Sequence, residues 1–456
     1  MQPTATRVRR LATVRSLLRR KARQTLRLSR KTVRLAFVLS GASVVALVSL
    51  GFSWLADLAL EWNRELTHGR GWVGLLLLPF GLAALRWLTL RLAPQAVGSG
   101  IPQVIGALSL PNGAAQGRLV SLAQAAWKIP LTFLGMLCGA SIGREGPAVQ
   151  VGAAAMLAWG RFWQGRLQFI GGFQPRELIA AGAAGGLAAA FNAPLAGVVF
   201  AIEELGRGAS LRWDRFVLIG VLACGLMVVA VIGNNPYFGM FGAADITGES
   251  WVWLLIAAVV NGVLGGWFAR TLIGGPTGLV PRRWRPWVRR HPIWVAFVLG
   301  FIVALIGLAT GGATFGTGYD AAASVLAGHT LDSAWFGIAK WLATVGSYLA
   351  GIPGGIFTPA LTVGSGIGEH LWHLAGGAVD LRLIGLISMT AFLAAATQAP
   401  ITAGVVVMEM TGSQSTLFAL LVVALVASVV SRQFCPRPFY HTAAARFRHD
   451  ALQASR

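Results

Sequence analysis

One acidic residue interrupts a strongly apolar region, in the short segment 143–147, which reads Gly-Arg-Glu-Gly-Pro. An ionised carboxylate at Glu145 would cost several kcal/mol at bilayer depth unless water, an ion or a helix terminus received it. The two glycines release the backbone from regular helix, and Pro147 suits the first turn of a following helix. The N–H groups that begin such a helix favour an anion. An acid placed where an anion would bind predicts a gate or a proton carrier.

Other candidate donors in the chain indicate the same chemistry. Ser99 lies between two glycines and before Pro102, and Tyr440 offers a phenolic O–H after the last apolar stretch. The N–H groups of Ile356 and Phe357 would open a second helix after another glycine pair. Donors without a full positive charge bind an anion weakly enough to release it, as conduction requires. Nothing resembles a carboxylate cage, so we expect no metal and no cofactor.

The elements that must position these residues are apolar helices. The chain is 55% hydrophobic and only 12% charged, whereas soluble domains carry about 25% charged residues. The composition therefore predicts an all-α, polytopic membrane domain and argues against a soluble class. Apolar stretches near the roughly 20-residue membrane length occur around 35–60, 72–93, 119–140, 178–202, 216–233, 251–273, 292–313, 340–362, 383–408 and 416–434.

The net charge of +22 is unevenly distributed along the chain. Residues 1–34 hold twelve Arg or Lys and no acid, whereas 233–250 and 326–337 hold no Lys or Arg. Because cytoplasmic segments are enriched in Lys and Arg, we expect both termini in the cytoplasm. Residues 1–34 would then form a basic arm on anionic membrane lipid, and 446–456 a short cytoplasmic tail. The sequence shows no nucleic-acid-binding motif beside the arm, so nucleic acid is not an expected partner.

The membrane region contains two related halves, about 35–232 and 250–440. The matching pairs are 188–203 with 394–409, 98–101 with 316–319, and 143–147 with 355–359. Interrupted segments at corresponding positions of two halves are the best sequence pointer to a transporter site at their interface. Counting apolar stretches leaves open whether the halves are inverted.

Four segments in order resemble the anion site of the CLC family of chloride channels and transporters. They are 98–102, 143–147, 355–359 and the late Tyr440, and the similarity extends over 35–445. The resemblance implies a short bacterial-type member without CBS domains, built as an inverted repeat with broken and re-entrant helices. It further implies a homodimer with a pore in each subunit, set in the inner or plasma membrane, with chloride ions and protons as partners.

The resemblance also assigns a role to each matching residue. Ser99 and Tyr440 would supply the hydroxyls of a central anion site, completed by the N–H groups of Ile356 and Phe357. Glu145 would be the external gate, whose carboxylate competes with the anion and swings away when protonated. Taken alone, Ser99 could instead be an ordinary helix-breaking serine, and Tyr440 could be an interfacial anchor.

Three further residues have supporting roles in this reading. The backbone of Arg144 and Gly146 would contribute to an outer anion site. Lys128 would raise the local positive potential, unless its ammonium snorkels from a helix end. Because Gln103 stands where some relatives carry an acid, Arg144 is expected to lack a carboxylate partner nearby. A structural pair between Arg144 and Glu145 is the alternative, although adjacent helical residues point apart.

An internal glutamate separates exchangers from channels best within this family, and it falls on Glu204. Its presence predicts chloride/proton antiport, with a passive chloride-selective channel as the alternative. Ser99 in place of proline favours chloride over nitrate. Glu203 and Glu409 occupy equivalent repeat positions, and we expect them to bond backbone N–H groups. The chain is not expected to be a membrane-embedded enzyme, because no histidine lies within an apolar stretch to act as a base.

Overall fold

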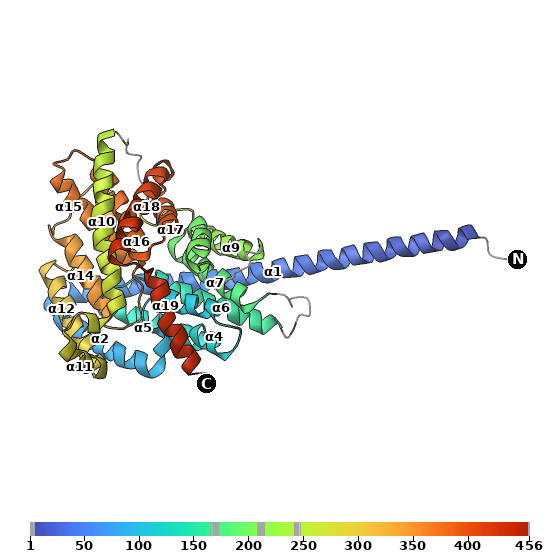
Figure 1. Ribbon diagram of the computed structural model, residues 1–456, viewed down its shortest axis with the longest axis horizontal. Helices are drawn as coiled ribbons and strands as arrows, with labels where there is room; N and C mark the ends of the chain where they lie inside the picture. The colour runs from blue at the N-terminus through green and yellow to red at the C-terminus, as the bar shows by residue number, and fades with distance from the viewer. Residues whose placement is uncertain are drawn as a thin grey trace.

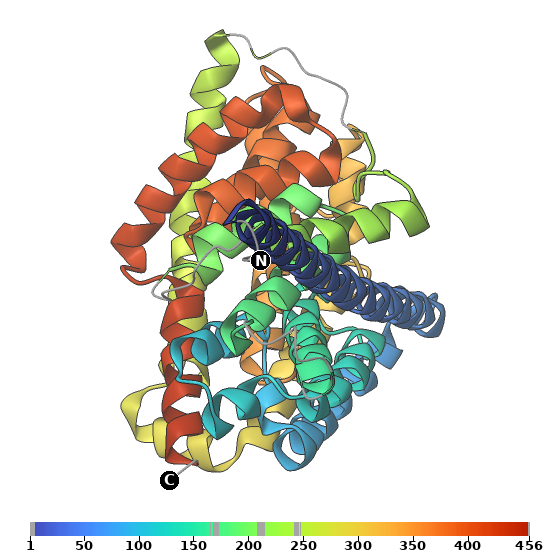
Figure 2. The ribbon, with the colours of Figure 1, turned by 90° about the vertical axis from the view of Figure 1, so that its right-hand side faces the viewer.

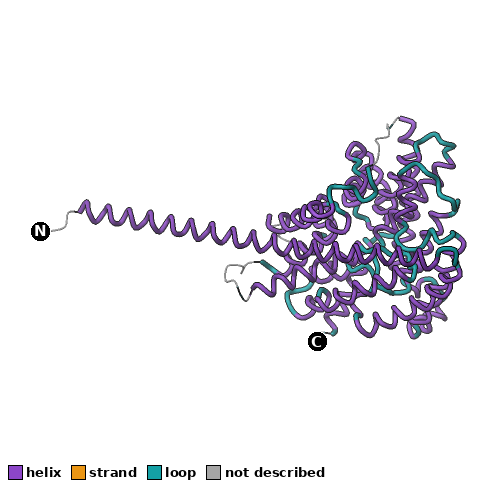
Figure 3. Tube along the Cα trace, turned by 180° about the vertical axis from the view of Figure 1, so that it is seen from behind, coloured by secondary structure: helices purple, strands orange, loops and turns teal. Residues whose placement is uncertain are grey.

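The computed structural model describes residues 5–164, 166, 173–207, 215–240, 246 and 248–454. For residues 5–30, 215 and 216 it describes the backbone alone. Within the described residues every regular element is a helix (Figure 3), and extended pairing is limited to two isolated bridges. The all-α prediction is therefore confirmed.

The first half of the chain begins with one long helix and continues through shorter ones. Its helices are α1 (Ala5–Thr67), α2 (Trp72–Leu92), α3 (Ile101–Ser109), α4 (Ala114–Leu119), α5 (Leu122–Leu137), α6 (Glu145–Gln164), α7 (Pro175–Phe191), α8 (Pro194–Phe200) and α9 (Arg215–Ile232). Helix α1 has no break between the predicted arm and the first apolar stretch, and it extends far beyond the body of the molecule (Figure 1).

The second half repeats this order, except that its short helix α11 has no counterpart in the first half and α4 has none in the second. Its helices are α10 (Gly248–Gly274), α11 (Arg285–Arg290), α12 (Pro292–Ala309), α13 (Tyr319–Leu326), α14 (Phe336–Leu349), α15 (Phe357–Leu374), α16 (Leu381–Thr397), α17 (Pro400–Thr411) and α18 (Leu417–Phe434). A final helix, α19 (Phe439–Gln453), leaves the second half and packs on α3 and α4 of the first (Figure 2). Helix α19 continues through residue 446, where the sequence predicted a separate tail to begin.

Six helical segments in the described part of the chain are long and apolar enough to cross a membrane. They are Lys31–Thr67, Trp72–Leu92, Ala114–Leu137, Gly248–Gly274, Pro292–Ala309 and Gln414–Phe434. The prediction of a single membrane-crossing helix was wrong for three other stretches, around 178–202, 340–362 and 383–408. Each of them contains parts of two helices with a break between them. Apolar composition continues through these breaks, so length alone could not reveal them.

Backbone conformation confirms the repeat that the sequence indicated. Left-handed φ angles occur at equivalent positions of the two halves, and such angles are uncommon outside glycine. The pairs are Gly98 and Gly316 (66° and 60°), Gly100 and Gly318 (96° and 78°), Gly139 and Gly351 (90° and 72°), and Asn192 and Gln398 (52° and 60°). Asn192 and Gln398 end α7 and α16, which places the breaks before α8 and α17.

Close helix pairs form the centre of each half. A Cβ built on Gly152 of α6 would lie 2.3 Å from the Gly182 carbonyl of α7. A Cβ on the equivalent Gly364 of α15 would lie 2.4 Å from the Ser388 carbonyl of α16. Small residues let membrane helices approach to backbone contact. This tight packing fixes the starts of α6 and α15, on which the candidate site is built.

Candidate anion site

Backbone hydrogen bonds join three of the four predicted segments. The Gly98 N–H donates to the Ile352 carbonyl at 3.0 Å, and the Gly354 N–H donates to the Gly98 carbonyl at 3.1 Å. Gly143 and Gly355 exchange a reciprocal pair of N–H···O bonds at 2.8 and 2.7 Å. The interruptions of the two halves therefore meet at one place, as the repeat predicted.

Buried donors hold the loop that precedes α3. Lys128 Nζ donates to the carbonyls of Ala96 and Gly98 at 3.0 and 2.9 Å. Gln103 Nε2 donates to the Val97 carbonyl at 2.7 Å. Because buried carbonyls require hydrogen-bond partners, these side chains fix the conformation of the loop. The Lys128 side chain is fully buried, so the alternative that it snorkels to the surface was wrong.

The hydroxyls of Ser99 and Tyr440 are buried and free of partners. The two residues are 1% and 0% exposed. Their hydroxyls lie near each other, but neither has a hydrogen-bond partner at normal geometry among the described residues. A buried hydroxyl left unpaired costs about 1–3 kcal/mol. The Phe357 ring stacks on the Tyr440 ring with centroids 6.2 Å apart and planes inclined by 11°. Both hydroxyls are therefore held in place with their donors available to a ligand.

Helices α6 and α15 begin against each other, beside the Ser99 hydroxyl. A Cβ built on Gly355 would lie 3.0 Å from the Gly146 nitrogen, and one on Gly146 would lie 2.2 Å from Ser99 Oγ. Ile356 and Phe357 are buried, and their N–H groups make no backbone hydrogen bond within the described residues. The positive end of the α15 dipole adds to these donors. The arrangement suits a small anion.

The Glu145 carboxyl group lies over the start of α15. It is completely buried, near the N–H and hydroxyl of Thr358. Neither carboxyl oxygen has a hydrogen-bond partner at normal geometry among the described residues. A Cβ on Gly143 would lie 2.4 Å from Glu145 Oε2, so only glycine leaves room for this position. The carboxyl group thus occupies a place that an anion could take instead.

Arg144 forms an ion pair with Asp57 of α1, and the described residues show no ion pair between Arg144 and Glu145. Its Nη1 also donates to the Ser53 carbonyl at 2.6 Å, and its guanidinium lies 5.9 Å from the centre of the Tyr237 ring. The prediction that Arg144 lacks a carboxylate partner was therefore wrong. Its partner comes from α1 rather than from α3. The alternative of a pair between Arg144 and Glu145 is also wrong.

Glu204 is the second buried acid without a hydrogen-bond partner in the described chain. Its side chain is 1% exposed and neither carboxyl oxygen is bonded. It lies in a short π-helical turn, Ala201–Leu205, that continues from α8. Glu145 and Glu204 both lie within electrostatic range of the Tyr440 hydroxyl. One hydroxyl of the candidate site therefore interacts electrostatically with both predicted proton carriers.

Glu203 and Glu409 cap helices of opposite halves in a reciprocal arrangement. Glu203 accepts hydrogen bonds from the N–H groups of Ile401 and Thr402 at the start of α17, at 3.2 and 2.6 Å. Glu409 accepts from the first N–H groups of α8, those of Leu195 and Ala196, at 3.1 and 2.6 Å. A carboxylate at a helix N-terminus is stabilising. The expected structural role of these two glutamates is confirmed.

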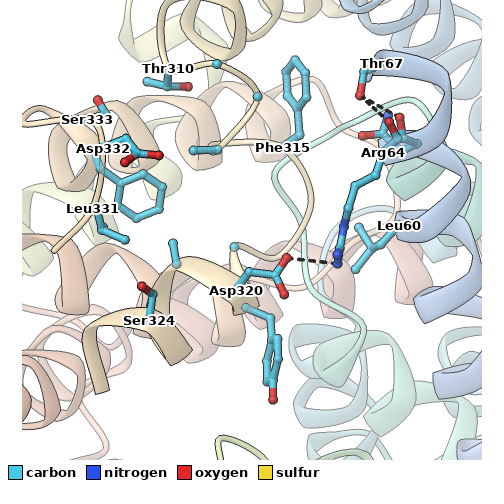
Figure 4. Close-up of a pocket in the computed structure, with 18 of the residues that line it drawn as sticks. Leu60, Arg64, Thr67, Thr310, Phe315, Asp320, Ser324, Leu331, Asp332 and Ser333 are labelled. Atoms are coloured by element: carbon cyan, nitrogen blue, oxygen red, sulfur yellow. Dashed lines mark hydrogen bonds and ion pairs between the residues drawn. The ribbon is translucent and has the colours of Figure 1, made fainter. Parts of the chain in front are cut away.

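Two neighbouring cavities lead from the surface toward Arg144. The smaller, about 460 Å³, is lined by Asp57, Arg144 and Tyr237, and the larger measures about 900 Å³. Arg64 and Asp320 line both cavities and form an ion pair at 3.0 Å between α1 and the start of α13 (Figure 4). The smaller cavity reaches the segment that carries Glu145, because Arg144 lines it.

Two contacts near the candidate site were not predicted from the sequence. Asp57 is 87 residues from Arg144, and no local pattern links them. Lys340 of α14 donates to the carbonyls of Thr314 and Gly316 at 2.9 and 2.7 Å, as its counterpart Lys128 does in the first half. The 212-residue spacing between the two lysines matches the repeat and could have revealed this second one.

Comparison with known proteins identifies relatives of the whole chain. The family model for voltage gated chloride channels matches residues 80–432. An H(+)/Cl(-) exchange transporter ClcA from Cronobacter sakazakii is 30% identical over 469 aligned positions, which cover 96% of this chain and 93% of the relative. An H(+)/Cl(-) exchange transporter ClcA from Yersinia pestis is 30% identical over 376 positions, covering 79% of this chain and 75% of its own length.

Solved structures show the same fold. A slow cyanobacterial Cl-/H+ antiporter superposes with a TM-score of 0.75 at 25% identity, covering 93% of this chain and 99% of the antiporter chain. A CLC-type fluoride/proton antiporter gives a TM-score of 0.71 at 21% identity, covering 90% and 97% of the two chains. The family match covers most of the described membrane region, and the relative from Cronobacter sakazakii aligns with 96% of the chain. This chain belongs to the voltage gated chloride channel (CLC) family.

Proposed function

We propose that this chain exchanges chloride for protons across the inner (plasma) membrane. The observation that carries the proposal is the pair of buried, unpartnered carboxyl groups, Glu145 and Glu204, within electrostatic range of the Tyr440 hydroxyl. Passage of an anion alone requires neither acid, whereas ionisable residues inside a membrane mark proton relays. The names of the bacterial relatives, which are H(+)/Cl(-) exchange transporters, support the same function.

Chloride would bind centrally between hydroxyls and helix starts. The Ser99 and Tyr440 hydroxyls and the N–H groups of Ile356 and Phe357 would donate to one dehydrated ion. No cationic side chain would touch it, so the ion could leave again. Lys128 would support the site from behind the Ser99 loop, where its ammonium bonds two carbonyls and adds positive potential.

Coupling would follow from competition at an outer site formed by backbone of Arg144 and Gly146. The ionised Glu145 carboxylate would occupy this site and exclude chloride. Protonation would remove its charge, so the side chain would leave and chloride would enter. Glu204 would receive or supply the proton at the other end of its path. The transport cycle would thus move chloride and protons in opposite directions.

Liposome flux measurements separate exchange from the alternative, a passive chloride channel. Purified protein in vesicles under a chloride gradient should drive protons uphill, in the direction opposite to chloride, and a protonophore should collapse the proton signal. Chloride movement without any uphill proton movement would contradict exchange and support the channel. Proton uptake that is independent of the chloride gradient would contradict both functions.

We place both termini in the cytoplasm, because the basic residues of 1–34 favour that side. The arm would lie near anionic lipid, continuous with the membrane-crossing part of α1. Cleavage of the arm by a protease added only to the cytoplasmic side of membrane vesicles would support this orientation. Cleavage from the opposite side alone would reverse it.

A homodimer would cover the face formed by α8, α9, α17 and α18. The capped starts of α8 and α17 lie at this face, where Leu195 and Ile401 are 53% and 50% exposed. Helix starts and carboxylates at membrane depth are tolerated only when protein or a water-filled cavity covers them. The exposed apolar residues of the face include Leu226, Val231, Phe418, Leu425 and Val429.

The mass of the purified protein in mild detergent tests this assembly. We expect a protein mass of twice the 48.0 kDa chain, with detergent subtracted by light scattering. A mass of one chain at micromolar concentration would contradict the dimer. The transport cycle proposed above would not be affected by that result, because all its residues lie in one chain.

A further inference from the structure

Glu204 differs from its repeat partner in a way that packing does not explain. The equivalent position of the second half is Met410, which lies in regular α-helix, whereas Glu204 lies in a π-helical turn. Both side chains are buried. Single π turns within helices occur frequently at functional sites. The first half therefore has a buried acid, Glu204, at the position where the second half has the apolar residue Met410.

The buried Glu204 carboxyl group has a titratable neighbour. His441 of α19 follows Tyr440, and its Nε2 lies 3.1 Å from the Glu204 carbonyl and 3.6 Å from Glu204 Oε1. The His441 side chain is 23% exposed, whereas that of Glu204 is 1% exposed. The partly exposed imidazole ring thus connects the buried carboxyl group with solvent.

We infer that His441 relays protons between solvent and Glu204. The inference rests on the proposed function, because it requires Glu204 to carry protons. Histidine suits this task because its two ring nitrogens can bind one proton while releasing another, and because it titrates between about pH 5 and 8. Nothing in the alternative channel function requires such a group.

The proton step balances without any further reactant. A hydronium ion from solvent gives its proton to Nδ1 of the neutral ring and becomes water; Nε2 of that ring lies on the side of Glu204. The resulting imidazolium passes its Nε2 proton to the ionised carboxyl oxygen. This transfer converts the imidazolium into a neutral ring and the carboxylate into a neutral acid. The net charge of the pair is zero before and after the transfer. The reverse sequence releases a proton to solvent.

The charged groups around His441 keep its protonated form transient. Burial lowers the pKa of His441, the hydrogen bond to the Glu204 carbonyl raises it, and the Arg207 guanidinium lowers it. Arg207 itself is held by the Gln398 carbonyl at 2.8 Å and by Glu203 at 3.6 Å. Since a lowered pKa favours the neutral ring at pH 7, a proton taken up is readily passed on.

The variant His441→Gln tests the relay while preserving the local contact. The glutamine amide can still donate to the Glu204 carbonyl but carries no proton. We expect chloride-driven proton transport to slow roughly tenfold or more, as for loss of a proton-transfer group, and to lose the part of its pH dependence that an imidazole contributes between about pH 5 and 8. Imidazole buffer on both sides of the vesicle should restore much of the rate. Chloride binding by titration calorimetry should remain unchanged.

A matched control lies on the same helix. His449 is exposed, and its ring hydrogen-bonds with the Gln453 side chain, so His449→Gln should transport protons at the wild-type rate. Wild-type proton transport by His441→Gln, or a slowing that imidazole does not relieve, would overturn the relay. If the unmodified protein moves no protons, the proposed function itself fails, and that result is seen before any variant is made.

Discussion

Replacement of Glu145 by glutamine should abolish proton movement and leave chloride flux intact. The neutral amide matches the carboxylic acid in shape but cannot carry a proton, so coupled proton transport should fall roughly 100-fold or more. It also lacks the charge that competes with an anion at the start of α15, where the carboxyl group now lies. Paired chloride and pH electrodes on the same vesicles measure both fluxes.

Glu65→Gln provides the charge-matched control. Glu65 is an exposed acid of α1, and its replacement should leave both fluxes at wild-type values. Retention of chloride-driven proton pumping by Glu145→Gln would refute the gating role of this residue. Loss of both fluxes in a folded Glu145→Gln protein would show that the carboxyl group supports the anion site rather than competing for it.

Gly146→Ala should remove the central site by filling it. The added methyl group would lie 2.2 Å from Ser99 Oγ and 2.9 Å from the Ser99 carbonyl, and the carbonyl belongs to a backbone fixed by Lys128. The Ser99 hydroxyl must then move away from the helix starts. Loss of this donor to a bound ion, worth about 1.5–3 kcal/mol, corresponds to roughly a 10- to 100-fold fall in chloride affinity, and chloride flux at low chloride concentration should fall with it.

Two other variants make this result interpretable. Gly51→Ala adds the same methyl group to α1, where nothing lies within 4 Å, and should not change the flux. Ser99→Ala removes the hydroxyl without any added bulk and should reduce the flux in the same direction even if Gly146→Ala fails to fold. Wild-type chloride flux in Ser99→Ala would exclude that hydroxyl from the site.

The sequence predicted the local breaks of the fold well. Glycine and proline change the backbone conformation at their own positions. The segments 98–102, 143–147 and 355–359 therefore predicted interrupted helices without knowledge of the tertiary structure. The repeat then indicated that the breaks meet, and backbone hydrogen bonds between Gly143 and Gly355 confirm it. The family prediction is also confirmed by the match to residues 80–432. The roles of the individual site residues remain predictions.

Contacts between distant elements were beyond sequence reasoning. The pairing of Arg144 with Asp57 depends on the path of α1, and the approach of His441 to Glu204 depends on α19 returning to the first half. Neither contact leaves a periodic or spaced pattern in the chain. The internal ends of spans such as 383–408 were missed for a different reason, since Gln398 breaks the helix inside an apolar run.

The central claim is that one anion binds between two helix starts and two hydroxyls, at a place for which a carboxyl group competes. Anomalous diffraction from crystals soaked in bromide tests it most directly. The account predicts a bromide peak in contact with Ser99 Oγ, Tyr440 Oη and the N–H groups of Ile356 and Phe357, and no such peak in Gly146→Ala. Bromide bound only elsewhere in the unmodified protein would contradict the account.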